Sequence, residues 1–357
     1  MVCTFLSCCL MALPSAIVAD DLPTTGEESE LSAPLDKVVL ESMDLIGARA
    51  AVLAVSYRGH VVVSRGYGWA DRRRSKPTQP TTTFRLASNS KPITAAITRE
   101  LIRHGKLDSG LKVFQYLELV PFQNQLGDER LKDVTVQHLL DHKGGWDRDA
   151  AFDPMYQLKR IQTEMRVLNN FSSHHVIQYM LSQPLQLAPG EKRAYSNFGY
   201  VVLGRVIEKQ TGESYGTALQ SNIGDPLGLH DIHVSGHPPN GSNVVEVFYP
   251  DDVGFDMRVR DSAGGLAASA PSICEFLNRY WISGEPRKPR QRKLYWHFGS
   301  LPNTTTALME QRPDGIDYAV MFNARRNEHY VSDNDHLRSE LKKEFDLLSA
   351  RIKGQFE

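Results

Sequence analysis

Apolar side chains recur with a helical period in several stretches of the chain, separated by polar, turn-rich segments. Near the N-terminus, one face of an expected helix carries Leu35, Val38, Val39, Met43 and Ile46. The same reasoning predicts further helices at about 88–104, 199–209, 271–280 and 335–348. Residues 106–190 are also mostly helical in pattern.

Strand-like runs lie near both ends of the chain. Residues 51–57 and 60–67 are separated by Arg58-Gly59, which predicts a hairpin. Further strand-like runs occupy residues 293–298, 304–311 and 316–323. No stretch beyond the extreme N-terminus has the roughly 18 apolar residues that a membrane-spanning helix needs.

Strands at both ends and helices between them predict an α+β fold. Its antiparallel sheet is built from both chain ends and flanked by helices, and it carries an inserted, mostly helical domain. Within one domain at 35–348, residues 35–105 and 245–348 form the expected sheet part and 106–244 the helical part. A cleft between two such parts is a natural position for a site.

The N-terminus has the composition of an export signal. Residues 2–19 are apolar or small, carry no charge and end before Asp20-Asp21, which predicts a signal peptide at 1–19 and a secreted or periplasmic protein. An uncleaved membrane anchor stays open as an alternative. Residues 20–34 are acidic and polar and predict a flexible leader. After cleavage only Cys274 of the 4 cysteines remains, so we expect it in the core, without a disulfide.

Composition and charge limit the kinds of partner that we expect the protein to bind. Lys and Arg number 41 against 42 Asp and Glu, a net charge of −1, which argues against a general nucleic-acid binder. The one basic cluster, residues 287–293, is interpreted as a solvated loop. A site for an anionic polymer and a charged rim of the cleft are its alternatives.

Ser88 and Lys91 are the first candidates for chemistry. They are three residues apart at the start of an expected helix, so their side chains share a face. The helix N-terminus offers free N–H groups to a developing oxyanion, and an amine of lowered pKa can take the hydroxyl proton. Ser339 and Lys342 have the same spacing, but we interpret them as the exposed face of a charged helix.

Two later segments carry further candidates. Tyr195 and Asn197 enter a helix from a loop, where a phenol can move a proton and an amide can hold a substrate. His297, Gly299 and Ser300 follow a strand-like run; the glycine permits close approach, and the N–H of Ser300 can be an oxyanion donor. Each segment taken alone is equally compatible with an ordinary turn or strand end.

His138 and His142 are four residues apart on a helical pattern, a spacing that metal ligands use. No glutamate completes a zinc-binding H-E-x-x-H motif around them, and His174-His175 are adjacent rather than suitably spaced. We therefore predict no metal site at these histidines.

Together the three segments resemble the superfamily of serine β-lactamases and penicillin-binding proteins, in particular class C β-lactamases, D-alanyl-D-alanine carboxypeptidases and esterases. The resemblance covers about residues 35–345 and includes Leu139-Leu140-x-His142-x-Gly144-Gly145, Leu187-Ala188-Pro189-Gly190, Pro226-Leu227-Gly228-Leu229 and Ala263-Gly264-Gly265-Leu266. It implies a β-lactamase/transpeptidase-like fold. It also implies that Ser88 is acylated by a small-molecule or peptide acyl substrate, and that Lys91 and Tyr195 share the acid and base work. No metal or organic cofactor is implied.

The resemblance further implies that Asn197, His297, Gly299 and Ser300 bind the substrate, with the N–H groups of Ser88 and Ser300 as the oxyanion hole. The family has threonine where this chain has Phe298. The lost hydroxyl would weaken recognition of a substrate carboxylate, unless Arg325 or Arg326 replaces it. We therefore expect a secreted serine hydrolase acting on an ester, amide or β-lactam, with esterase or D-alanyl peptidase activity favoured over β-lactamase. A non-catalytic binding protein on the same fold is the alternative.

Overall fold

The computed structural model describes residues 22–356 except 240, 253, 289, 290 and 292. The expected signal peptide at 1–19 lies outside the described residues. Within them, no helix combines the length and hydropathy that crossing a bilayer requires.

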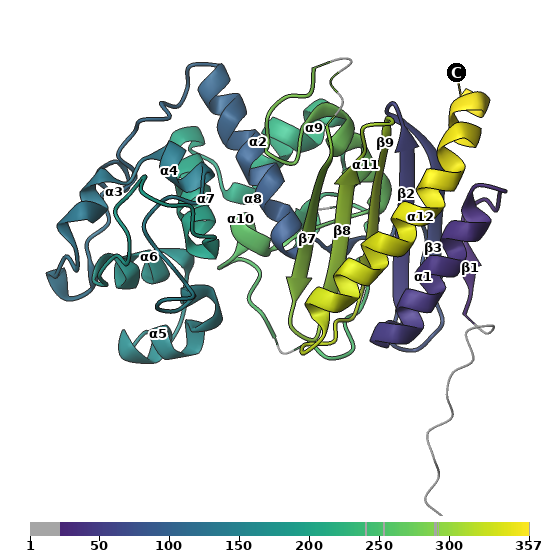
Figure 1. The fold of residues 1–357 in the computed structure, drawn as a ribbon. Coiled ribbons are helices and arrows are strands. Elements are labelled where there is room, and N and C mark those ends of the chain that lie inside the picture. Colours follow the sequence, from purple (N-terminus) through teal and green to yellow (C-terminus); the bar gives the residue numbers. More distant parts are fainter. Residues whose placement is uncertain (1–21, 240, 253, 289–290, 292, 357) are drawn as a thin grey trace, which may run out of the picture.

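A six-stranded antiparallel sheet forms the centre of one half of the molecule (Figure 1). Its strands in spatial order are β1 (Thr24–Thr25), β3 (His60–Gly68), β2 (Ala50–Tyr57), β9 (Ile316–Phe322), β8 (Thr305–Gln311) and β7 (Tyr295–Leu301). β2 pairs with β9, with Ala54 opposite Ala319, so both chain ends build the sheet as expected. β7 is an edge strand.

Helices cover both faces of this sheet. α1 (Ser32–Ile46) and α12 (Tyr330–Phe356) lie across one face, and α11 (Ala270–Arg279) lies behind the other (Figure 1). α2 (Ser90–Arg103) packs mainly against α7 (Asn197–Thr211) and α10 (Asp261–Gly264). All residues of β2 are buried because the strand alternates between two cores: Leu53 and Val55 pack toward α1 and α12, whereas Val52 and Ala54 pack toward α11. The apolar residues expected on α1 pack into the first of these cores.

The middle of the chain is mostly helical and lies to one side of the large sheet (Figure 1). Its helices are α3 (Val113–Leu117), α4 (Val136–Leu140), α5 (Leu158–Glu164), α6 (Ser173–Leu181), α7 (Asn197–Thr211), α8 (Tyr215–Leu219) and α9 (Asp225–Leu227). Single turns are η3 (Phe122–Asn124), η4 (Glu129–Asp133), η5 (Pro154–Tyr156) and the π-turn η6 (Gln220–Gly224).

Between the two halves lies a small sheet of β4 (Phe84–Arg85), β6 (Leu266–Ala268) and β5 (His233–Val234). The turn η2 (Ala87–Asn89) follows β4 directly, and the short helix α10 (Asp261–Gly264) precedes β6. Since β4 and β6 are paired, η2 and α10 are brought close to each other.

Three expectations about local structure need correction. The helix expected at 88–104 begins only at Ser90, with Ser88 in the turn η2 before it. The strand expected at 293–298 runs instead from Tyr295 to Leu301, so His297 lies within it rather than at its end. The leader expected to be flexible is partly held to the sheet, because Thr24–Thr25 pair with β3 and Arg65 donates to the carbonyl of Gly26.

Candidate active site

Ser88 is presented by a strained turn. Ala87 before it has φ +47°, a left-handed conformation that residues with a Cβ rarely adopt. The turn is fixed on both sides: the N–H of Leu86 donates to the carbonyl of Leu266, and the N–H of Leu266 donates to Ser90 Oγ at 3.1 Å. Such strain persists only where the surroundings enforce it. Here it leaves Ser88 partly exposed between two buried neighbours.

Lys91 lies buried in the first turn of α2, where its Nζ has three oxygen neighbours. These are Ser88 Oγ at 3.2 Å, Asn197 Oδ1 at 2.7 Å and the carbonyl of Ala263 at 2.5 Å. A neutral amine has two N–H groups for the two carbonyl oxygens and a lone pair that remains for the Ser88 hydroxyl proton. The arrangement therefore suits the base form of the amine.

The surroundings of Lys91 favour this neutral form. Burial lowers the pKa of its ammonium group to about 7, against the opposing charge of Asp153. The positive charges of Arg148 and Arg260 lower the pKa further. A substantial fraction of Lys91 is then unprotonated at neutral pH.

Tyr195 approaches Ser88 from the helical half. Its hydroxyl donates to Ser88 Oγ at 2.8 Å, and burial raises its pKa to about 12, so the phenol keeps its proton. Since Tyr195 supplies a proton to this hydrogen bond, the proton of the Ser88 hydroxyl is free to point toward Lys91. The ring of His142 stacks on Tyr195 at 4.6 Å between centroids, and the guanidinium of Arg148 lies 5.0 Å from the same ring.

Asn197 opens α7, and both ends of its amide are bound inside the protein. Oδ1 accepts from Lys91, and Nδ2 donates to Asp153 Oδ2 at 2.6 Å. In this structure Asn197 thus links the lysine to a carboxylate. Asp153 and the Ala263 carbonyl are site groups that the sequence analysis missed. The only signal for Asp153 is an Asp-Pro step, which marks a turn and not a position beside Lys91.

β7 brings the third segment against η2. His297 Nδ1 lies 2.8 Å from Asn89 Oδ1. It donates this hydrogen bond, because an amide oxygen can only accept. Burial lowers the pKa of His297 to about 3, so the ring is neutral. A Cβ on Gly299 would lie 1.9 Å from the carbonyl oxygen of Leu86. Only glycine therefore allows the edge strand to come this close, which places Ser300 near the turn that carries Ser88.

Phe298 lies on the other face of β7, which corrects our view of it. Its ring packs with Trp296, 5.5 Å between centroids, and against the core under α12. His297 and Gly299 face η2 because strand residues alternate between faces. The Phe298 side chain is thus directed away from η2, the turn that carries Ser88.

We expect the substitution Phe298→Thr to leave the rate of Ser88 chemistry within about threefold. It should lower the free energy of unfolding by about 1–2 kcal/mol, because a half-buried ring loses apolar contacts. Steady-state ester hydrolysis and urea denaturation measure the two effects. A gain of tenfold or more in activity toward a carboxylate-bearing substrate would contradict the position of this side chain.

Three other predicted features have separate roles. His138 caps α4 by accepting from the N–H of Thr135, and His142 accepts from the N–H of Ser196 beside Tyr195, so each ring has a structural hydrogen bond of its own. Cys274 is buried and donates to the carbonyl of Ala54, as expected for a core residue. Ser339 and Lys342 are exposed on α12, which confirms their interpretation.

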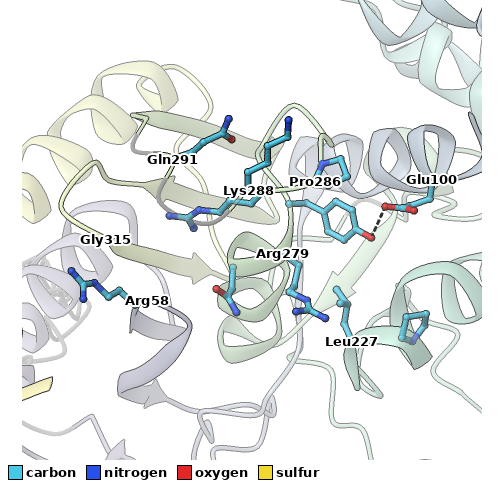
Figure 2. A pocket seen from close by; sticks show the side chains of 12 residues that line it. Arg58, Glu100, Leu227, Arg279, Pro286, Lys288, Gln291 and Gly315 are labelled. Carbon is cyan, nitrogen blue, oxygen red and sulfur yellow. Dashed lines mark hydrogen bonds between the residues drawn. The ribbon is translucent and has the colours of Figure 1, made fainter. Parts of the chain in front are cut away.

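The basic cluster contributes to a groove of about 930 Å³, shown in Figure 2, that Ser88 does not line. Arg287 in this groove is paired with the buried Asp317 at 2.5 Å, and Tyr280 beside it donates to Glu100. Lys288 is exposed. Of the described part of the cluster, Arg287, Lys288 and Gln291 line this groove, whose lining does not include Lys91 or Tyr195.

The fold and the convergence of a serine, a buried lysine and a tyrosine define a protein of the β-lactamase and penicillin-binding protein superfamily. The chain belongs to the beta-lactamase family, whose model matches residues 35–330.

Known relatives extend this assignment. The chain is 31% identical to Esterase EstB of Burkholderia gladioli over 257 residues, which are 69% of this chain and 64% of the esterase. It is 29% identical to Penicillin-binding protein 4* of Bacillus subtilis over 177 residues, 49% of this chain and 36% of that protein. The chain therefore spans less than two thirds of the length of these curated relatives.

Among solved structures, the fold is similar to that of the D-amino acid amidase from Ochrobactrum anthropi SV3. The TM-score is 0.64 at 19% identity, covering 88% of this chain and 99% of the amidase. It is also similar to the Beta-lactamase/D-alanine carboxypeptidase from Yersinia pestis, with a TM-score of 0.65 at 15% identity over 88% of this chain and 98% of the other. At these identities the likeness concerns the fold alone.

Proposed function

We propose that this protein is a secreted serine hydrolase in which Ser88 forms an acyl-enzyme with an ester or amide substrate. One observation carries the proposal: Ser88 Oγ lies 3.2 Å from Lys91 Nζ and 2.8 Å from the hydroxyl of Tyr195. The Lys91 amine, which burial favours in its neutral form, and the Tyr195 phenol, which keeps its proton, thus both contact one nucleophile. This is the arrangement that general base and acid catalysis at a serine requires.

The first half of the reaction begins with the neutral amine of Lys91. Ser88 Oγ forms a bond to the substrate carbonyl carbon while its proton passes to Lys91 Nζ. The bond to the leaving group then breaks, and the leaving oxygen or nitrogen takes a proton from Tyr195, which regains one from Lys91. In the second half, water attacks the acyl carbon and gives its proton to the same base pair. The acid product leaves, and the Ser88 hydroxyl is restored.

The negative charge on the carbonyl oxygen needs donors at the transition state. We assign them to the backbone N–H groups of Ser88 and Ser300. Support comes from the close approach of β7 to η2, which the missing Cβ of Gly299 permits. Loss of one such donor typically costs about 10²–10³ in rate.

Among the substrates that this chemistry could accept, we favour an ester or a D-alanyl-type amide over a β-lactam. The similarity to Esterase EstB supports the ester. Secretion rests on the uncharged, apolar run at residues 2–19 and the acidic residues that follow it.

The test of the proposed function is pre-steady-state release of p-nitrophenol from a p-nitrophenyl ester by the full chain. We expect a burst close to one equivalent per protein, followed by slower turnover, because acylation outpaces deacylation for an activated leaving group. Penicillins and D-alanyl-D-alanine peptides, offered as competitors, would rank the substrate classes. If the protein shows neither a burst nor turnover with the ester, the penicillins or the D-alanyl-D-alanine peptides, the non-catalytic binding protein would be favoured.

A further inference from the structure

Asp153 uses its two carboxylate oxygens for two different purposes. Oδ1 accepts from the N–H of Met155 at 3.0 Å and so caps the turn η5. Oδ2 accepts from Asn197 Nδ2 at 2.6 Å, although the two residues are 44 positions apart in sequence. A cap needs a single acceptor oxygen. The second contact therefore adds nothing to the cap, and its effect lies at Asn197.

This second contact determines which way round the Asn197 amide lies. An amide oxygen can only accept a hydrogen bond and an amide nitrogen can only donate one, while an ionised carboxylate can only accept. The Asp153 carboxylate therefore holds the nitrogen of Asn197, and the oxygen is left to face Lys91 Nζ at 2.7 Å. In the reverse orientation two acceptor oxygens would face each other at Asp153 without a proton between them.

The orientation of the amide in turn decides what Lys91 can do for Ser88. The neutral amine donates its two N–H groups to the Asn197 oxygen and to the carbonyl of Ala263, and its lone pair is left for Ser88 Oγ at 3.2 Å. A reversed Asn197 amide would itself donate to that lone pair. The amine would then have no electron pair to receive the Ser88 proton.

Burial makes this hydrogen-bond arrangement strict. The exposed fraction of Lys91 is 2% and that of Asn197 is 9%, so water has little access to replace a missing partner. The main chain of Asn197 is held as well, because it opens α7 directly after Ser196, which caps the helix by accepting from the N–H of Gly199. The remaining freedom of this side chain is the rotation of its amide, which Asp153 removes.

We propose that Asp153 is a positioning residue for the catalytic base: it fixes the orientation of the Asn197 amide and thereby directs the lone pair of Lys91 at Ser88. Asp153 acts through Asn197 and not on the reacting atoms. The inference rests on the proposed function, in which Lys91 takes the Ser88 proton. Its negative charge has a second effect, because it raises the pKa of Lys91 and so opposes the effect of burial.

Other groups around Lys91 keep one charge state while the amine titrates. Those that act on Lys91, lie against it or are affected by its charge are Tyr195, Tyr200, His142, His297, Arg148 and Arg260. Burial lowers the pKa of both histidines to about 3 and raises the pKa of both tyrosines, so all four rings are neutral near pH 7. The two arginines stay charged. A pH step of activity near neutrality therefore reports Lys91.

The experiment exchanges the two side chains and measures hydrolysis of a p-nitrophenyl ester against pH. In Asp153→Asn the new amide still caps Met155 through its oxygen, so its nitrogen faces Asn197 and draws the oxygen of Asn197 away from Lys91. The pH-independent value of kcat/KM should fall about 10–10²-fold, as loss of a charged hydrogen bond gives. Asn197→Asp alone should lose at least as much, because two carboxylates then face each other.

The double variant Asp153→Asn/Asn197→Asp should recover to within about tenfold of the wild type, since the two changes compensate. Its amide at position 153 donates to a carboxylate at position 197, which presents an acceptor oxygen to Lys91 again. The midpoint of the pH step should move to lower pH in Asp153→Asn, where a negative charge is lost. It should move to higher pH in the double variant, where the carboxylate contacts Lys91 Nζ directly.

Recovery separates positioning from capping, because the cap of η5 is the same in Asp153→Asn and in the double variant. Asp149→Asn removes one negative charge from the same loop, at an exposed side chain beside Arg148, and should change neither the rate nor the midpoint. Circular dichroism and urea denaturation would show that each variant folds. An undiminished rate in Asp153→Asn, or a folded double variant no faster than either single variant, would overturn the inference while leaving Ser88-dependent hydrolysis intact.

Two further measurements keep the inference testable. If Asp153→Asn does not fold, Asn197→Asp and the double variant still provide the comparison. If the wild type hydrolyses no ester, the proposed function fails, and NMR titration of the ε-carbon of Lys91, assigned with Lys91→Gln, examines the same contacts. Its midpoint should be lower in Asp153→Asn and higher in the double variant than in the wild type. Equal midpoints in all three proteins would refute the inference.

Discussion

Replacement of Ser88 by alanine is expected to abolish the p-nitrophenol burst and to lower kcat by at least about a thousandfold. The reason is geometric: both Lys91 Nζ and the Tyr195 hydroxyl are directed at Ser88 Oγ, and no covalent intermediate can form without that atom. Alanine should fold normally, because the turn η2 already holds Ala87 in a more demanding conformation. Stopped-flow absorbance and mass spectrometry of the acylated protein measure the effect.

The second serine of the same spacing provides the matched control. Ser339 stands three residues before Lys342 on the exposed face of α12, so Ser339→Ala should keep the full burst. An undiminished burst in Ser88→Ala would assign the ester hydrolysis to another nucleophile, and the proposed function would fail.

The pH dependence of activity should report the state of Lys91. Because burial lowers its pKa to about 7, kcat/KM is expected to rise with pH through a single ionisation near that value and then level off. Below it, the ammonium has no lone pair to receive the Ser88 proton. Lys91→Gln should lower kcat/KM by about 10²–10⁴ and remove the step, whereas Lys342→Gln should change neither.

The same shift predicts a pH dependence of stability. In the unfolded chain the lysine holds its proton up to its ordinary pKa of 10.5, so between pH 7 and that value the unfolded state binds more protons than the folded one. The free energy of unfolding should therefore rise with pH in this window. Urea denaturation at several pH values would show a steeper rise for wild type than for Lys91→Gln. Equal slopes would mean that Lys91 is not neutral in the folded protein.

The sequence was sufficient for the parts of the site that depend on local spacing. Ser88 and Lys91 meet because one helical turn brings them together. The order of strands and helices was enough to predict a sheet built from both chain ends. Groups contributed by distant loops left no such signal: Asp153 and the carbonyl of Ala263 reach Lys91 only because η5 and α10 pack against α2 and α7.

The direction of the Phe298 side chain could not be predicted for a different reason. Ending the strand three residues too early put His297 near its end, where alternation between faces no longer decides the direction of the next side chain. With β7 continuing to Leu301, alternation places Phe298 beneath α12 and Gly299 against η2. A small error in a strand boundary therefore became an error about the direction of a side chain, because the faces of a strand alternate at every residue.

The order of strands in the sheet also determines when the protein can complete its fold during synthesis. Ser56 on β2 and its partner Asp317 on β9 are 261 residues apart in sequence. Asn89 and its hydrogen-bond partner His297 are also far apart in sequence. A growing chain thus carries its nucleophile long before the edge strand that completes the surroundings of that nucleophile. Until β9 docks, β2 presents an unpaired edge made of residues that are all buried in the finished fold. Such distant pairing makes folding slow and leaves truncated chains prone to aggregation rather than partly active.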